Sequence, residues 1–167
     1  PELDKSIYKA RPMASAAKFE DKVVLSGIGQ SEVGRRIMGN PLLLTVDACM
    51  KAIEDAGLKP EDIDGLATYP GGMMAGSGMS EGGITAVENV LRLRPTWHSG
   101  SSETPGQGGA IINAMLAVAS GLCKHVLCFR TVWEARHAEL MKQGYGRPSM
   151  GRVDGDMQWR IPFGASS

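Results

Sequence analysis

The chain has 167 residues, of which 43% are hydrophobic and 22% charged, a composition typical of one globular domain. Its 18 basic and 18 acidic residues cancel, so the charge favours neither nucleic acid nor an anionic membrane surface as a partner. We find no apolar run long enough to cross a bilayer and no signal peptide. The three cysteines lack the spacing of a metal site. These features together predict a cytoplasmic protein with reduced thiols and no bound metal.

The first 20 residues show no periodicity, and the stretch Met13-Ala-Ser-Ala is typical of a translation start. We interpret residues 1–20 as an N-terminal extension that is in part a tag. Residues 22–29 (KVVLSGIG) follow as a β-branched apolar run that ends in glycines, which predicts a buried strand. Asn40-Pro41 then predicts a helix start, with an Asn cap and Pro in the first turn. Gly57 predicts its end.

A strand is predicted next at residues 63–69, and the order strand, helix, strand favours a parallel βαβ unit. The remaining predicted elements are a helix at 84–93, a strand starting at 95–99, a helix at 106–122, a strand at 125–132 and a helix at 134–143. We assign residues 21–133 to one core domain. Residues 134–167 are interpreted as the start of a loop domain that is truncated. Glycine and proline are scattered through these residues, which indicates an irregular segment.

The predicted helix at 106–122 organises the chain. Between Ala110 and Ala119 only Asn113 is polar, so no face of this helix suits water. The apolar run is about half of the ~20 residues that a membrane span needs, so we expect a central helix inside the protein, with layers packed on both sides. Its entrance offers free N–H groups and a positive partial charge.

Most familiar catalytic motifs are absent from the sequence. It contains no HExxH, paired CxxC or GxSxG, so metalloprotease, zinc-finger and α/β-hydrolase functions have no support. Gly27-Ile28-Gly29 begins like a dinucleotide fingerprint, but the third glycine position holds Glu32. The glycines at 106–109 lack the Lys and Ser/Thr of a phosphate loop.

Candidate site residues therefore gather just before the central helix. The hydroxyls of Ser101, Ser102 and Thr104 lie near its free N–H groups, where they cap the helix or leave those groups to stabilise an anion on a bound acyl group. His98 is a further candidate. Met79 belongs to a Gly- and Met-rich segment, residues 71–83, which is either a simple connection or a loop facing an apolar ligand. The remaining candidates are given structural or solvent-exposed roles: Cys123 and Cys128 as core thiols, His125 as structural, and His137 as solvated.

Four segments carry a family resemblance. They are residues 48–66, ending AGLKPEDIDGL; residues 79–91, MSEGGITAVENVL; residues 108–129, GGAIINAMLAVASGLCKHVLCF; and residues 158–167, QWRIPFGASS. In this order they resemble the N-terminal half of a thiolase-superfamily protein. The likeness is closest to lipid-transfer, sterol-carrier-protein-type thiolases and their steroid side-chain aldolase relatives.

The resemblance implies an α/β, thiolase-like layered fold: a mixed, largely parallel sheet on a central buried helix, with a fifth strand beyond Ser167. Thiolases place a nucleophilic cysteine at the entrance of this helix, and residues 101–105 contain none. Thr104 is nearest to the lost cysteine, so the implied catalytic residues are Thr104, Ser102 and His98. Contacts to coenzyme A would come from Gly106, Gly108 and Met79. The missing half would supply the family's catalytic histidine motifs.

By the same resemblance, the expected reaction is carbon–carbon cleavage of a β-hydroxyacyl-coenzyme A, with a sterol-like side chain, by a retro-aldol route that needs no cysteine. Coenzyme A enters as part of the substrate, and no cofactor is held covalently. The alternatives are an acyl-CoA acyltransferase and a non-catalytic lipid-binding or scaffold subunit. The expected assembly is a homodimer, or a heterocomplex with an OB-fold acyl-CoA-binding protein, formed around residues 97–101. The chain by itself is expected to be inactive.

Overall fold

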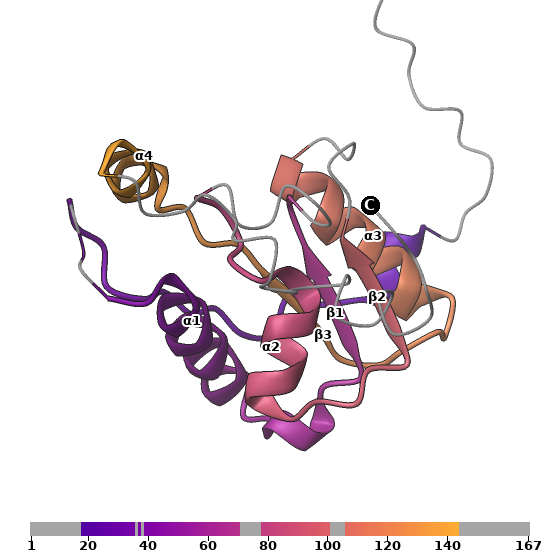
Figure 1. The fold of residues 1–167 in the computed structure, drawn as a ribbon. Coiled ribbons are helices and arrows are strands. Elements are labelled where there is room, and N and C mark those ends of the chain that lie inside the picture. The colour runs from indigo at the N-terminus through magenta and orange to yellow at the C-terminus, as the bar shows by residue number, and fades with distance from the viewer. Residues whose placement is uncertain (1–17, 36, 38, 71–77, 101–105, 144–167) are drawn as a thin grey trace, which may run out of the picture.

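A computed structural model describes residues 18–35, 37, 39–70, 78–100 and 106–143. Helix α3 lies on one face of a small sheet and helices α1 and α2 lie on the other (Figure 1). The elements in chain order are η2 (Phe19–Lys22), α1 (Pro41–Asp55), η3 (Pro60–Asp62), β1 (Gly65–Thr68), α2 (Gly83–Leu91), β2 (Trp97–Gly100), α3 (Gly106–Ala119), β3 (Val126–Phe129) and α4 (Glu134–Lys142).

The sheet has the strand order β2-β1-β3, and both strand pairs are parallel. The register sets Leu66 of β1 opposite His98 of β2 and Leu127 of β3. Parallel neighbours need crossover connections, and α2 and α3 supply them. Parallel pairing is therefore confirmed, but the βαβ unit predicted from residues 22–29, the next helix and residues 63–69 is wrong, because residues 22–29 form no strand. All the described strand pairs are parallel. The mixed sheet and its fifth strand beyond Ser167 therefore stay predictions.

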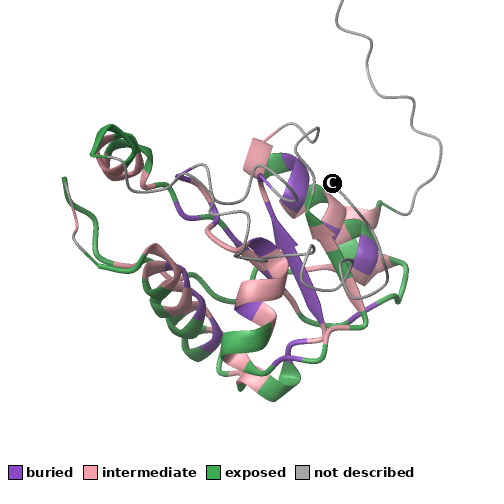
Figure 2. Cartoon of the chain, in the orientation of Figure 1, coloured by how far each residue is buried: buried purple, intermediate pink, exposed green. Residues whose placement is uncertain are grey.

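Alternating side chains of the strands divide the core into two clusters. Leu66, Leu127 and Phe129 pack with buried residues of α1 and α2. Ala67 points to the other face and packs against Ala110 and Ala114 of α3. Strand β1 is the most buried element, because all four of its residues are buried (Figure 2). An alternation of two residues thus assigns each strand position to one layer.

Helix α1 begins and ends as its sequence predicts. The Asn40 side chain accepts a hydrogen bond from the Leu42 N–H at 2.9 Å, and Pro41 occupies the first turn. Gly57 follows the helix with φ of +68°, a conformation that costs glycine little. Prediction of a helix at 134–143 is also confirmed by α4, which ends at Lys142.

Asp64 joins the entry points of all three strands. Its carboxylate accepts the Lys124 N–H at 2.9 Å and the His125 N–H at 2.8 Å, just before β3. Its own carbonyl accepts the Thr96 N–H at 2.8 Å, just before β2. The side chain of one residue and its main chain therefore align β2 and β3 on β1.

The strand predicted at residues 22–29 is wrong. The segment is extended but unpaired, and Val24, Leu25 and Ile28 are 85%, 82% and 82% exposed. A Cβ at Gly27 or Gly29 would collide with the backbone of α1, so the absence of a side chain at both positions allows the segment to lie close to the helix. Lys22 belongs to the 3-10 helix η2, and no described strand pairs with the residues that follow it.

Helix α3 differs from its prediction in one respect. The sheet-facing residues Ala114 and Ala117 are buried as expected, at 5% and 3% exposure. On the other side, Ile112 and Leu116 are 48% and 45% exposed, so burial on all sides is wrong for the described part of the chain (Figure 2). The sequence pattern correctly indicated that this face is apolar, but the other described residues leave it exposed. None of the described helices is long and apolar enough to cross a membrane.

Candidate functional site at the carboxyl edge of the sheet

The carboxyl ends of β1, β2 and β3 meet at one edge of the sheet, at the top in Figure 1. Thr68, Gly100 and Phe129 are the last residues of these strands. Helix α3 starts at Gly106 beside the same edge, after the short connection from β2 (Figure 1). Ligands in parallel α/β sheets bind outside the carboxyl ends of strands. This edge is therefore the candidate site.

Two connecting segments close part of this edge. The Ser80 N–H donates to the Thr131 carbonyl oxygen at 2.9 Å, and the Trp133 N–H donates to the Gly78 carbonyl oxygen at 2.7 Å. Between them, Met79 and Val132 form an antiparallel bridge. The residues that follow β1 and β3 are thereby fixed to each other across the edge.

Hydrogen bonds from buried hydroxyl groups stabilise this junction. Thr68 Oγ1 donates to the Phe129 carbonyl oxygen at 2.8 Å, and Ser80 Oγ donates to the Tyr69 carbonyl oxygen at 3.1 Å. The hydroxyls of Thr45 and Thr131 hydrogen-bond to each other, which links α1 to the end of β3. Since each of these hydroxyls has a partner, we assign them a structural role.

Arg130 supplies a positive charge at the edge. Its guanidinium carbon lies 5.3 Å from the centre of the Tyr69 ring, within the range of a cation–π contact. Its Nη2 lies 3.5 Å from the sulfur of Met79, and the side chain is exposed. Neither contact neutralises the charge, so Arg130 remains able to bind an anionic group.

The entrance of α3 begins at Gly106, whose φ of +64° favours glycine. At Gly108 an added Cβ would meet nothing within 4 Å, so the first turn is open on that side. The side-chain oxygen of Gln107 is buried and has no hydrogen-bond partner in the described chain. The predicted catalytic residues Ser102 and Thr104 lie outside the described residues, as does Ser101.

The other predicted site residues are only partly brought together. Met79 lies at the carboxyl edge beside Arg130. His98 pairs in register with Leu66, whose side chain packs toward α1 and α2, so His98 is on the sheet face opposite α3. The His137 ring packs edge-on against Trp133 at 5.1 Å between centroids and is half-buried, so its prediction as a solvated residue is wrong.

None of the described cysteines is prepared for nucleophilic attack. Burial raises the pKa of Cys49 to about 12. Burial, and then the neighbouring Cys123, raise the pKa of Cys128 to about 11. Burial, and then the charge of Asp64, raise the pKa of Cys123. All three thiols stay protonated at neutral pH, whereas nucleophilic attack needs a thiolate. No group of three or more metal-binding side chains occurs in the described ranges.

Sequence reasoning missed Tyr69, Ser80 and Arg130. A signal for two of them was present, because Tyr69 and Arg130 directly follow the last residues of β1 and β3. Carboxyl ends of neighbouring parallel strands meet at one edge, so side chains just after two such strands are neighbours. Ser80 had no comparable signal, since its place depends on hydrogen bonds to Tyr69 and Thr131.

The described residues form an α/β fold with a three-stranded parallel sheet, and two proteins similar to the chain are named as aldolases. The chain is 26% identical over 144 residues to the "Steroid side-chain-cleaving aldolase" of Thermomonospora curvata, which covers 86% of this chain and 35% of that protein. It also superposes on the solved structure of the "Ltp2-ChsH2(DUF35) aldolase" with a TM-score of 0.54 and 25% identity, over 85% of this chain and 33% of that one. The chain thus spans about a third of each relative. No protein-family model matches it.

Proposed function

We propose that this chain forms the acyl-binding part of an enzyme that cleaves a carbon–carbon bond in a β-hydroxyacyl-coenzyme A by a retro-aldol reaction. The observation that carries the proposal is the similarity to a steroid side-chain-cleaving aldolase along 86% of the chain. That aldolase is about three times as long as the aligned part, so the complete activity belongs to a longer protein or assembly.

The reaction itself requires few protein groups. A base takes the proton of the β-hydroxyl, and the oxygen forms a carbonyl as the bond between the α- and β-carbons breaks. The electron pair of that bond passes to the α-carbon, which gives an enolate with negative charge on the thioester oxygen. Protonation of the α-carbon releases the shortened acyl-coenzyme A. The reaction is redox-neutral overall, because the gain at the α-carbon balances the loss at the β-carbon, and no acyl-enzyme forms.

We assign the enolate oxygen to the entrance of α3. The first N–H groups of a helix have no partners within the helix, and its dipole favours negative charge there. Donors aimed at the place where charge develops are a strong source of transition-state stabilisation. The open first turn at Gly108 allows close approach of a thioester. The raised pKa values of Cys49, Cys123 and Cys128 support this route over an acyltransferase that needs a thiolate.

Arg130 would bind an anionic group of the substrate. It is the exposed cation placed at the carboxyl edge by β3, beside Tyr69 and Met79. Phosphates of the coenzyme A moiety are the strongest anions in the substrate, and arginine matches their geometry. The catalytic base is left to the part of the longer protein that these residues do not span.

The test joins this chain to the part of the Thermomonospora curvata aldolase that it does not span, and mixes the product with a β-hydroxyacyl-coenzyme A. Mass spectrometry should detect equal amounts of carbonyl product and shortened acyl-coenzyme A. Arg130→Ala should raise KM by about tenfold, the loss of roughly one charge-assisted contact, and Arg130→Lys less. Arg136→Ala is the matched control, because Arg136 pairs with Glu139 at 3.0 Å.

Two results would contradict the proposal. An acyl group covalently attached to the protein after substrate addition would instead support the acyltransferase. Binding of acyl-coenzyme A without any product, in a fusion that folds, would support the non-catalytic lipid-binding subunit.

A further inference from the structure

Gln107 is the second residue of α3 and continues the side of this helix that faces the sheet. Ala110, Ala114 and Ala117 on that side are buried. Gln107 precedes Ala110 by three residues, which places both on one face of the helix. Tyr69 directly follows β1 and packs against the cluster that contains Ala110 and Ala114. Because the first turn of α3 lies beside the end of β1 (Figure 1), Gln107 is located where the helix entrance meets the carboxyl edge.

The side-chain carbonyl oxygen of Gln107, Oε1, is buried and accepts no hydrogen bond within the described chain. The buried hydroxyls of the carboxyl edge donate elsewhere: Thr68 to the Phe129 carbonyl oxygen and Ser80 to the Tyr69 carbonyl oxygen. A buried acceptor without a donor lowers the stability of a protein, and folded proteins contain few of them. We therefore expect a ligand to supply the donor.

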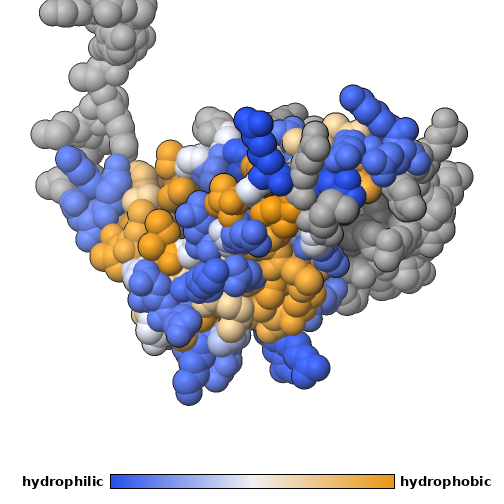
Figure 3. Space-filling model, turned by 90° about the vertical axis from the view of Figure 1, so that its left-hand side faces the viewer, coloured by the Kyte–Doolittle hydropathy of each residue, from blue (hydrophilic) through white to orange (hydrophobic). Residues whose placement is uncertain are grey.

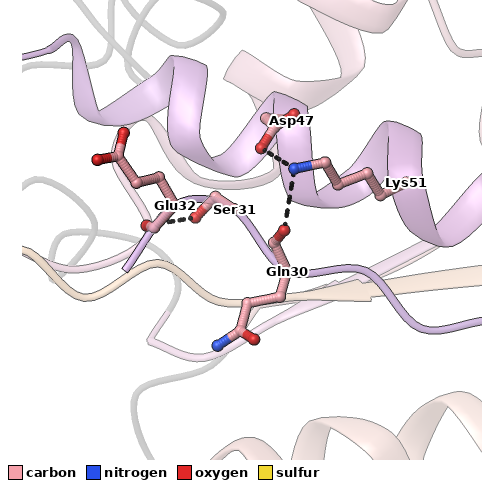
Figure 4. Close-up of polar contacts among 5 residues, drawn as sticks. All are labelled: Gln30, Ser31, Glu32, Asp47 and Lys51. Carbon is pink, nitrogen blue, oxygen red and sulfur yellow. Dashed lines mark hydrogen bonds and ion pairs between the residues drawn. The ribbon is translucent and has the colours of Figure 1, made fainter. Parts of the chain in front are cut away.

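Other parts of the described chain do not offer an equivalent group at the site. Seen from the side of α1, apolar side chains gather in the middle of the molecular face (Figure 3). Polar groups on α1 are paired there, since Lys51 Nζ donates to the Gln30 carbonyl oxygen at 3.2 Å and to Asp47 at 2.7 Å (Figure 4). Nε1 of Trp133 is also buried and unpaired among the described residues, but Trp133 precedes α4, which lies on the opposite side of the molecule from α3 (Figure 1). Gln107 is thus the unpaired buried group beside the α3 entrance.

The proposed reaction decides which donor of a β-hydroxyacyl-coenzyme A is available to this oxygen. The thioester oxygen is assigned to the first N–H groups of α3, so the donors that matter are those close to the thioester. One is the β-hydroxyl, but its proton passes to the base. The other is the amide N–H of the thioethylamine arm, the short link between the sulfur of coenzyme A and its first amide. This N–H loses no proton, so its hydrogen bond is kept in the substrate, the enolate and the product.

We propose that Gln107 binds the thioethylamine arm of coenzyme A by accepting a hydrogen bond from its amide N–H at Oε1. The inference rests on the proposed function for the choice of coenzyme A as the ligand. A buried acceptor rejects a ligand that lacks the donor, because the oxygen then stays unpaired in the complex. Gln107 is therefore a specificity-determining residue for the thioester carrier, and its role is separate from that of Arg130, which would bind the phosphates.

The test measures binding to the same fusion by calorimetry, with butanoyl-coenzyme A and with its analogue in which an oxygen atom replaces this N–H. Neither ligand has a β-hydroxyl, so neither can be cleaved and binding is measured apart from the reaction. The unaltered fusion should bind butanoyl-coenzyme A about tenfold more tightly than the analogue. Gln107→Leu should reduce this preference to less than about twofold by weakening the binding of butanoyl-coenzyme A. Gln107→Met, which keeps the length of the side chain without the amide, should give the same result.

The matched control is Gln143→Leu, because Gln143 is an exposed glutamine at the end of α4, and it should keep the full preference. Three results would overturn the inference: equal affinities of the unaltered fusion for the two ligands, no binding of either, or a preference that survives Gln107→Leu. Cleavage of a β-hydroxyacyl-coenzyme A is assayed separately. A fusion that cleaves its substrate but shows no preference refutes the role of Gln107 alone, whereas a Gln107-dependent preference without cleavage refutes the proposed function alone.

Stability of the 167-residue chain gives a measurement that needs no ligand. Gln107→Leu removes an unpaired acceptor, so the urea midpoint should stay unchanged or rise. Asn40→Ala is the comparison and should lower the midpoint, because it removes the hydrogen bond from the Leu42 N–H that caps α1. A fall for Gln107→Leu as large as that for Asn40→Ala would show that Oε1 has a partner within the chain, and would overturn the inference.

Discussion

Replacing Asp64 by alanine should destabilise the chain far more than its position outside any strand suggests. The carboxylate accepts main-chain N–H groups from both Lys124 and His125 at the start of β3. A hydrogen bond to a charged acceptor contributes about 1.5–3 kcal/mol, and partial exposure places these two at the low end. We therefore expect a loss of about 3 kcal/mol, or roughly 6–12 °C in Tm for a chain of this size.

The assay is equilibrium unfolding in urea, followed by circular dichroism. Asp64→Ala should lower the midpoint without changing the slope, because the surface exposed on unfolding stays the same. Asp64→Asn should lose about half as much, because one amide oxygen can replace the carboxylate oxygen that accepts both N–H groups. Asp62→Ala is the control: it removes a single 2.8 Å bond from the Lys59 N–H, at a cost of about 1 kcal/mol. If Asp64→Ala cost no more than Asp62→Ala, alignment of the strands by Asp64 would be refuted.

Three further predictions concern folding. Ala114→Glu should prevent soluble folding, since it places an unpaired charge against the sheet, while Ile112→Glu on the exposed side of α3 should leave a folded chain; soluble yield and circular dichroism compare them. The free energy of unfolding should fall as the pH rises above about 9. Thiols of the unfolded chain have a pKa near 9.0, whereas burial raises the pKa of Cys49 to about 12 and that of Cys128 to about 11, so only the unfolded chain ionises there. Cys49→Ala should make the free energy depend less on pH in urea titrations. Asn40→Ala should cost about 1 kcal/mol by removing the α1 cap, measured in the same way.

Features set by neighbouring residues were predictable from the sequence. The cap at Asn40, the stop at Gly57 and the burial of Ala114 follow from contacts within one or two turns, or from an apolar stripe that a helix must cover. The parallel sheet followed from the order of elements, because a crossover helix leaves few other pairings.

Features that depend on residues distant in the sequence were not predictable from it. Residues 22–29 have the composition of a strand, but a strand exists only where a neighbour offers hydrogen bonds, and that information is not local. His98 was chosen for its place in the chain, yet the register that sets it opposite Leu66 decides which face it occupies. Likewise His137 lies in a polar stretch, and only the ring of Trp133 reveals that it is half-buried.

The side of α3 that faces the sheet is formed by Gly109, Ala110, Ala114 and Ala117. Glycine and alanine have no side-chain rotamers, so docking this helix costs no rotamer entropy. The same lack of rotamers means that the interface cannot adapt by exchanging one side-chain arrangement for another. Heating should therefore leave the helix in a single position on the sheet until it separates as a unit. The location of its first turn, beside the ends of the strands, is then set by how the side chains of the sheet, such as Trp97 and Val126, pack against these small residues.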